Sequence, residues 1–71
     1  MSAIAAHMAG IVIRINVQVG DAVQPGQDVV VLESMKMEIP VQAEAAGTVR
    51  AVNVKEGDFV NEGDILVELE G

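Results

Sequence analysis

The residues with the clearest potential for chemistry are a lysine held between two methionines, in the stretch Glu33-Ser34-Met35-Lys36-Met37-Glu38. A lysine that reaches solvent can enter the active site of another protein. Composition alone explains Lys36 equally well as an ordinary solvated charge with no further role. The two flanking methionines favour a recognition element. A small β-domain cannot bury both thioethers, and exposed thioethers form adaptable contact surfaces.

The remaining residues do not form a catalytic set. The chain has no cysteine, no Ser/His/Asp constellation and no glycine-rich phosphate loop before a helix. Asp21 and Asp58 fall in expected turns, where a carboxylate bonds its own backbone rather than acting as an acid or base. His7 is the single histidine and cannot build a zinc site alone. We therefore expect a protein that is not an enzyme and that has no metal site.

Length, composition and charge restrict the fold and the partners. The 71 residues are expected to form one small domain (1–71). The hydrophobic fraction of 51% is rich in Val and Ile, whose branching at Cβ favours an all-β fold. The net charge of −7 argues against nucleic acid and anionic membranes and suits basic clefts on protein partners. With no membrane-length apolar run and no secretory signal, we expect a cytoplasmic protein that is monomeric when isolated.

The chain is a tandem repeat. Shifting the sequence by 37 positions places 1–33 on 38–70 without a gap and gives 13 identities over 33 positions. The identical positions in the first copy are Ala6, Ala9, Gly10, Val12, Asn16, Val17, Gly20, Asp21, Val23, Gly26, Val30, Leu32 and Glu33. Two copies predict a β-domain with two-fold pseudosymmetry, in which 34–37 is the hairpin that joins the halves. Met1 and the close fit of the copies favour a nearly whole protein.

Each copy predicts four short strands separated by turns. The expected strands are 2–6, 10–17, about 23, and 29–33, then 39–43, 47–54, about 60, and 65–70. Glycine at positive φ and aspartate bonded to its own backbone are typical of such turns. The structural turn residues are expected to be Gly20, Asp21, Gly26, Gly57, Asp58 and Gly63. Eight such strands indicate a flattened β-barrel or sandwich.

The second strand of each copy contains a predicted bend. Ile11, Ile13 and Val19 look like part of one buried face, but their partners in the second copy are Thr48, Arg50 and Glu56. They are therefore expected to be exposed or half covered. The positions that are apolar in both copies change parity between Val12 and Ile15, which a β-bulge would produce.

The pseudosymmetry also predicts where the lysine lies. If a two-fold axis relates the copies, the link between them lies opposite the two chain ends. A four-residue link between apolar strands is a hairpin of common length. Lys36 is therefore expected at an exposed hairpin tip, at the end of the molecule farthest from both termini.

The lysine stretch resembles the biotin-attachment motif of biotinyl domains, whose usual core is Ala-Met-Lys-Met. The Gly-Asp-x-Val-x-x-Gly signature of the biotinyl/lipoyl fold also occurs twice, at 20–26 and 57–63. The resemblance covers nearly the whole chain and is closest to small, free-standing biotin carboxyl carrier (biotin/lipoyl attachment) proteins. It implies a barrel-sandwich hybrid of two pseudo-two-fold-related four-stranded halves, without the thumb insertion. Ser34 in place of alanine, and 7–10 in place of Pro-Met-Pro-Gly, are not expected to alter the chemistry.

The resemblance implies that a biotin protein ligase joins biotin to the ε-amine of Lys36. The flanking residues that the ligase would recognise are Glu33, Ser34, Met35 and Met37. The modified domain would shuttle a carboxyl group between a biotin carboxylase and a carboxyltransferase, as in an acyl-CoA carboxylase of fatty acid biosynthesis. Two alternatives stay open. One is a lipoyl carrier of a 2-oxo acid dehydrogenase-type system, whose tip is usually Asp-Lys-Ala, with lipoate as the cofactor. The other is an interaction module whose lysine stays bare.

Overall fold

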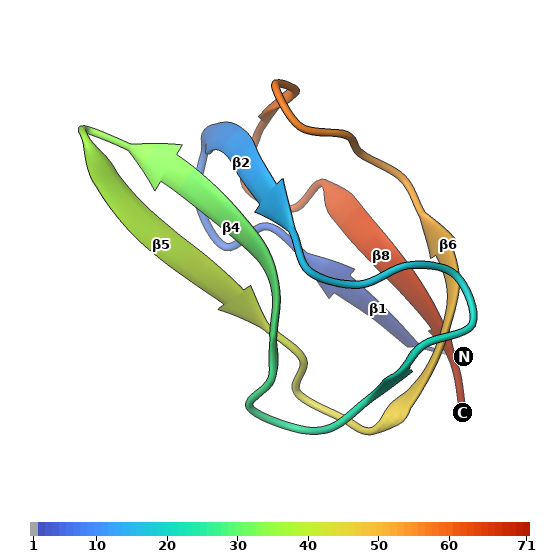
Figure 1. Cartoon of the computed structure of the whole chain (residues 1–71). Coiled ribbons are helices and arrows are strands. Elements are labelled where there is room, and N and C mark those ends of the chain that lie inside the picture. The colour runs from blue at the N-terminus through green and yellow to red at the C-terminus, as the bar shows by residue number, and fades with distance from the viewer. Residues whose placement is uncertain (1) are drawn as a thin grey trace.

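Two four-stranded antiparallel sheets face each other in the computed structural model, which describes residues 2–71 (Figure 1). The strands are β1 (Ser2–Ala5), β2 (Gly10–Ile15), β3 (Ala22–Val23), β4 (Asp28–Ser34), β5 (Met37–Gln42), β6 (Gly47–Val52), β7 (Phe59–Val60) and β8 (Ile65–Glu70). One sheet has the order β1-β8-β6-β3 and the other β5-β4-β2-β7. The predicted all-β, flattened barrel or sandwich is confirmed. None of the described residues lies in a helix that is long and apolar enough to cross a membrane.

The internal repeat relates one sheet to the other. A shift of 37 residues places β1, β8, β6 and β3 on β5, β4, β2 and β7, in the same order. The register repeats as well, since Ser2 pairs with Leu69 and the equivalent Ile39 pairs with Leu32. Each sheet therefore takes two strands from each copy. The copies interlock rather than forming separate halves, so neither copy can complete a sheet without the other.

A β-bulge interrupts the second strand of each copy. The pairing of β2 with β4 shifts register between Val12 and Arg14, and that of β6 with β8 shifts between Val49 and Ala51. The predicted bend is confirmed. The exposure of Ile11 and Val19 is also confirmed: Ile11 alternates with the buried Val12, and Val19 lies in the turn beyond the end of β2.

Two predicted strand boundaries were wrong by two residues. The strands β2 and β6 end at Ile15 and Val52, not at 17 and 54. After the end of β2, one backbone hydrogen bond still joins the chain to β4, from Asn16 N to Val29 O at 2.9 Å. The strand β5 begins at Met37 rather than at 39, because the hairpin pairing extends to the turn.

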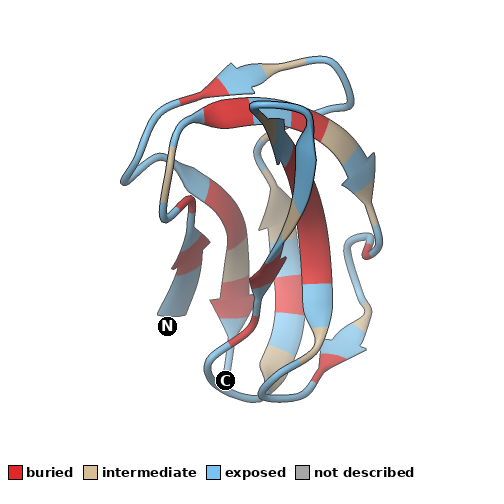
Figure 2. Ribbon diagram, turned by 90° about the vertical axis from the view of Figure 1, so that its left-hand side faces the viewer, coloured by how far each residue is buried: buried red, intermediate tan, exposed pale blue. Residues whose placement is uncertain are grey.

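The core between the sheets is aliphatic. Its largest buried side chains include Leu32, Leu66 and Leu69, and no polar or charged side chain is buried within residues 2–71. Buried and exposed positions recur along the strands of both sheets (Figure 2). Burial of a Leu or Val side chain contributes about 1.5–3 kcal/mol, so these layers are the main source of stability in a domain of this size.

Candidate functional site

The lysine stretch forms a β-hairpin with a two-residue turn. Ser34 of β4 pairs with Met37 of β5, which leaves Met35 and Lys36 as the turn residues. Their φ angles are 53° and 65°, and positive φ at both central residues is the pattern of a type I′ turn. Asn and Gly are the usual residues there, and a larger side chain costs about 1 kcal/mol or more at positive φ. The tip is therefore a strained turn held in place by the paired strands behind it.

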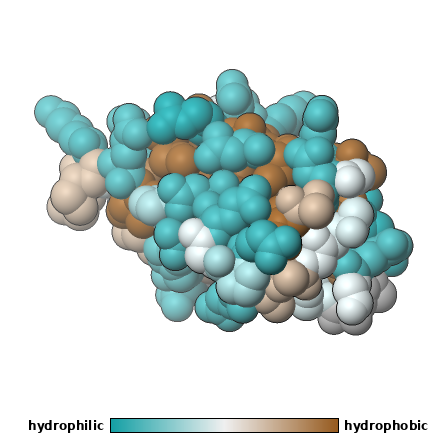
Figure 3. All heavy atoms as spheres, turned by 60° about the horizontal axis from the view of Figure 1, so that its bottom comes forward, coloured by the Kyte–Doolittle hydropathy of each residue, from teal (hydrophilic) through white to brown (hydrophobic). Residues whose placement is uncertain are grey.

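The turn presents its side chains to solvent. Met35 is 91% exposed, Met37 is 60% exposed, and Lys36 is exposed between them. The two ion pairs found within residues 2–71 use Arg14 and Arg50, so no carboxylate in that part of the chain holds the Lys36 ammonium. The hairpin projects from the body at the end opposite the two termini (Figure 1), and side chains extend outward at the left-hand end of the space-filling view (Figure 3). A partner can therefore approach the Lys36 amine without moving any described part of the fold.

The strands behind the turn divide its neighbours between two faces. Ser34 and Met37 lie on the same side as the buried Leu32 and its half-buried partner Ile39. Glu33 and Glu38 are opposite each other on the outer side, where two like charges repel. The exposed fractions show that both methionines are nevertheless outside the core, and an acidic pair lies between the turn and the body.

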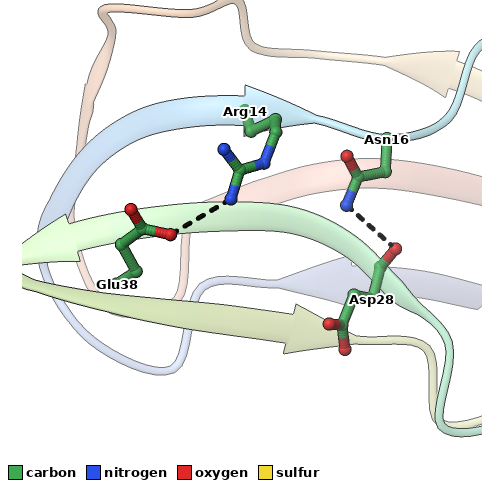
Figure 4. A network of polar contacts seen from close by, with 4 residues as sticks. All are labelled: Arg14, Asn16, Asp28 and Glu38. Atoms are coloured by element: carbon green, nitrogen blue, oxygen red, sulfur yellow. Dashed lines mark hydrogen bonds and ion pairs between the residues drawn. The ribbon is translucent and has the colours of Figure 1, made fainter.

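An arginine from another strand partly offsets that repulsion. The guanidinium of Arg14, on β2, reaches across β4 to Glu38 on β5, with 3.1 Å between Nη2 and Oε1 (Figure 4). The pair is exposed, so its contribution to stability is below about 1 kcal/mol. The ion pair connects the edge strand of the hairpin, β5, to β2 in the body of the domain. Arg14 was not among the predicted site residues; the available signal was that its counterpart in the second copy is the uncharged Ala51.

The base of the hairpin has no room for an additional atom next to Gly10. A Cβ at this glycine would be 2.8 Å from the carbonyl oxygen of Glu33, and one at the equivalent Gly47 would be 2.8 Å from that of Glu70. The two glycines were expected to open strands, but this close approach to the neighbouring strand was not predicted. It places β2 directly against the last residues before the turn.

The glycines and aspartates predicted for the other turns lie away from the hairpin tip and have structural roles. Four turns each contain a glycine with φ between 86° and 98°, namely Gly20, Gly26, Gly57 and Gly63. The Asp21 carboxylate accepts the backbone N–H of Gln18 at 2.9 Å, and Asp58 accepts that of Lys55 at 2.9 Å. These bonds satisfy backbone donors at turns that have few other partners. The geometry gives neither carboxylate a neighbouring group for acid–base chemistry.

The other polar side chains in residues 2–71 do not form a reactive arrangement either. His7 is exposed, with Nε2 3.4 Å from the Pro40 carbonyl oxygen. Residues 2–71 contain no cluster of three His, Cys, Asp or Glu side chains suited to a metal ion. Glu68 receives hydrogen bonds from Arg50 at 2.7 Å and Asn53 at 3.0 Å, and these bonds lower the pKa of the Glu68 carboxyl. This ion pair lies on the sheet that does not carry the hairpin.

Solved structures share this fold at high similarity. The Kluyveromyces lactis urea carboxylase matches 97% of this chain with 30% identity and a TM-score of 0.90, over 6% of its own length. A single-chain, multi-domain long-chain acyl-CoA carboxylase matches 93% with 35% identity and a TM-score of 0.86, over 7% of its length. The lipoyl domain of the 2-oxoglutarate dehydrogenase complex from Azotobacter vinelandii matches 97% with 28% identity and a TM-score of 0.75, over 98% of that domain.

The sequence comparisons agree with the structural ones. A biotin/lipoyl attachment protein from Bacillus subtilis (strain 168) is 53% identical over 38 residues, which span 54% of this chain and about half (52%) of that protein. The biotin/lipoyl family model, described as "Biotin-requiring enzyme", matches residues 1–69. The match includes both copies of the repeat and the hairpin between them. The chain therefore belongs to the biotin/lipoyl attachment family.

Proposed function

We propose that this protein is a biotin carboxyl carrier that bears biotin on Lys36. The observation that carries the proposal is the placement of one primary amine on a two-residue turn, exposed between two methionines and remote from both termini. A carrier must deliver one group to two different active sites. A rigid body and an arm that starts at a projecting tip suit that task.

The residues around the amine fit a covalently attached acid. The ε-amine of Lys36 and the carboxyl of biotin would form an amide, with net loss of water and of the ammonium charge, so the formal net charge falls from −7 by one to −8. The open turn leaves space for the attached chain, and no described acidic group has to lose an ion pair with Lys36. The paired strands fix where the arm begins.

When bound, biotin supplies the site that accepts and releases the carboxyl group, and the chemistry belongs to the cofactor and to the partner enzymes. The partners we propose are a biotin protein ligase, a biotin carboxylase and a carboxyltransferase, in the cytoplasm. The likeness to parts of a urea carboxylase and a long-chain acyl-CoA carboxylase supports a carboxylase system. An acyl-CoA is the acceptor that the sequence resemblance favours.

Lipoate on the same lysine is the second candidate. The similarity to a lipoyl domain of a 2-oxoglutarate dehydrogenase complex over nearly its whole length favours it. The Met35-Lys36-Met37 sequence at the tip favours biotin instead. Intact mass of the protein purified from its native host separates the candidates, because biotin, lipoate and no adduct give three different masses. A bare lysine in every preparation would contradict both carrier functions.

Replacement of the lysine is the matching genetic test. We expect Lys36→Ala to abolish avidin binding after treatment with a biotin protein ligase, while the circular dichroism spectrum and melting temperature stay unchanged, because the side chain packs against nothing in the core. Lys55→Ala is the control, since Lys55 lies in the turn before β7, and this variant should bind avidin like the wild type. Avidin binding by Lys36→Ala would show that the attachment site is elsewhere.

A further inference from the structure

An apolar patch lies on the outer face of the sheet that carries the hairpin. Ile11 of β2 pairs with Phe59 of β7 on one side and with Glu33 of β4 on the other. Ile11 is 43% exposed and Phe59, the single aromatic residue, is 64% exposed. Ile13, at the bulge of β2, is half-buried and does not pack against the core. We call Ile11, Ile13 and Phe59 the β2–β7 patch.

The fold itself does not require this patch, as the other sheet demonstrates. At the equivalent positions that sheet has Thr48 for Ile11, Arg50 for Ile13 and Ala22 for Phe59, and it has the same strand order and register. Arg50 there forms an ion pair with Glu68, whose counterpart on the hairpin sheet is the buried Val31. Thr, Arg and Ala at these positions are therefore compatible with the same strand order and register. The apolar side chains on one sheet need a different explanation.

The patch lies next to the tip. Glu33 and Glu38 form the row of paired residues that continues into Ile11 and Phe59, and the turn is two residues beyond this row. At ~3.3 Å per strand residue, the tip projects roughly 7 Å past the patch. A lysine side chain has only four methylene groups. An enzyme that acylates the Lys36 amine must therefore come close to the patch, whereas an enzyme that acts at the far end of an attached cofactor need not.

Acidic residues border the patch. Glu33 adjoins Ile11, and Glu56 belongs to the turn whose Gly57 N–H donates to the Val12 carbonyl oxygen of β2. The whole chain carries a net charge of −7. A second copy would bring the same charge, and three side chains are far fewer than the roughly 20–30 residues per side of a stable interface. The charge instead complements a partner whose apolar pocket is rimmed by Lys or Arg.

We propose that the β2–β7 patch is a second contact surface for the ligase that modifies Lys36, which binds it through an apolar pocket with a basic rim. The proposal rests on the function proposed above. Phe59 is the anchor, since large aromatic side chains dominate binding energy at interfaces. The methionines bring the lysine to the active site, and the patch fixes the orientation of the domain against the ligase.

The test converts the patch to the residues that the other sheet already carries. Ile11→Thr with Phe59→Ala reproduces Thr48 and Ala22 and should fold like the wild type. With a purified biotin protein ligase, we expect the KM for this double variant to rise about tenfold or more with little change in kcat. Higher salt should raise the KM of the wild type, because screening weakens contact with a basic rim.

Two exposed apolar residues outside the patch provide a matched control. Val19 and Ile65 are 65% and 42% exposed but lie outside the patch, so Val19→Thr with Ile65→Thr should leave the KM unchanged. If the wild type accepts biotin and the patch variant keeps the wild-type KM, the second contact surface is wrong while the carrier function stands. If the wild type accepts no biotin from the ligase, the proposed function itself fails.

Discussion

The two ends of the molecule are built from equivalent strand pairs and differ in how those pairs end. At one end β8 pairs with β1, and at the other β4 pairs with β5 in the same register, including the same irregularity near Ala5 and Asp28. Within residues 2–71 the second pair continues for two more residue pairs, Glu33 with Glu38 and Ser34 with Met37, and closes in the turn. The chain ends lie at the first pair (Figure 1).

The comparison of the two strand pairs shows which features the fold requires and which belong to the hairpin tip. Among the described residues, the β8–β1 pair completes its sheet without a turn, without positive φ at a non-glycine residue and without exposed methionines. Those features belong to the β4–β5 end alone within residues 2–71. The packing between the sheets is shared by both ends, so changes in the core should affect them equally. Changes at the tip should affect one end and its function.

The largest effect is expected in the core. Leu32 and Leu69 are equivalent by the repeat, and both are buried. Leu32→Ala and Leu69→Ala should each lower the free energy of unfolding by about 2–5 kcal/mol, because each leaves a cavity between the sheets. Urea denaturation followed by circular dichroism, with sulfate added if a variant is unfolded in buffer, measures both. A difference of more than about 2 kcal/mol between them would break the energetic equivalence of the two ends.

An intermediate effect is expected at the two crowded glycines. A Cβ at Gly10 or at Gly47 would meet a backbone carbonyl at 2.8 Å, so Gly10→Ala and Gly47→Ala should each destabilise the fold by about 1–3 kcal/mol. The displaced carbonyl belongs to Glu33 in one case and to Glu70 in the other. We therefore expect Gly10→Ala, but not Gly47→Ala, to slow biotin attachment to Lys36 in a ligase assay. Equal rates for both variants would show that the tip tolerates movement of its base.

A smaller effect of opposite sign is expected in the turn. Met35→Asn places a residue that tolerates positive φ at the first turn position and should stabilise the fold by about 1 kcal/mol. The same change removes an exposed thioether beside Lys36 and should slow biotin attachment. Met35→Leu is the control: it keeps the apolar bulk and the strain, so its stability should match the wild type. If Met35→Asn were modified at the wild-type rate, a recognition role for Met35 would be excluded.

The smallest effect is expected at the ion pair of the other sheet. The hydrogen bond from Arg50 lowers the pKa of Glu68 below its ordinary value of 4.5. A carboxyl with a lower pKa in the folded state stabilises the fold above its unfolded pKa and loses that contribution as the pH falls through the folded one. Glu68→Gln should therefore be slightly less stable at pH 7 in thermal melts, with a difference that shrinks as the pH falls below about 4.5 and through the lower pKa of the folded state. A difference that stays constant as the pH is lowered through this range would mean that the effect is not electrostatic.

Much of the fold could be predicted because the repeat compares each position with an equivalent one. Ile11 and Ile13 alternate like a buried face, but Thr48 and Arg50 at the same places indicated an exposed or half-covered one. The glycine turns were equally legible, since positive φ restricts the choice of residue. The ends of β2 and β6 were not, because Val17 and Val54 remain apolar after the ladder pairing has stopped.

The tip was predictable in position but not in detail. Its exposure follows from the two-fold relation, which puts the link between copies opposite the termini. The positive φ of Met35 and Lys36 contradicts their local preference, so the sequence favours no such turn. The contact between Arg14 and Glu38 joins residues 24 positions apart across an intervening strand. No local pattern indicates that pairing.

The sequence by itself determined the all-β class, the repeat, the bulges and the place of the lysine, because these depend on local periodicity and on symmetry within the chain. Only the tertiary structure decided how the two copies interlock, how tightly β2 approaches the hairpin and which apolar residues gather beside it. Those features depend on strand order and on distances between segments far apart in the chain. The pairing of the strands fixes these features, and the pattern of residues along the chain does not specify that pairing.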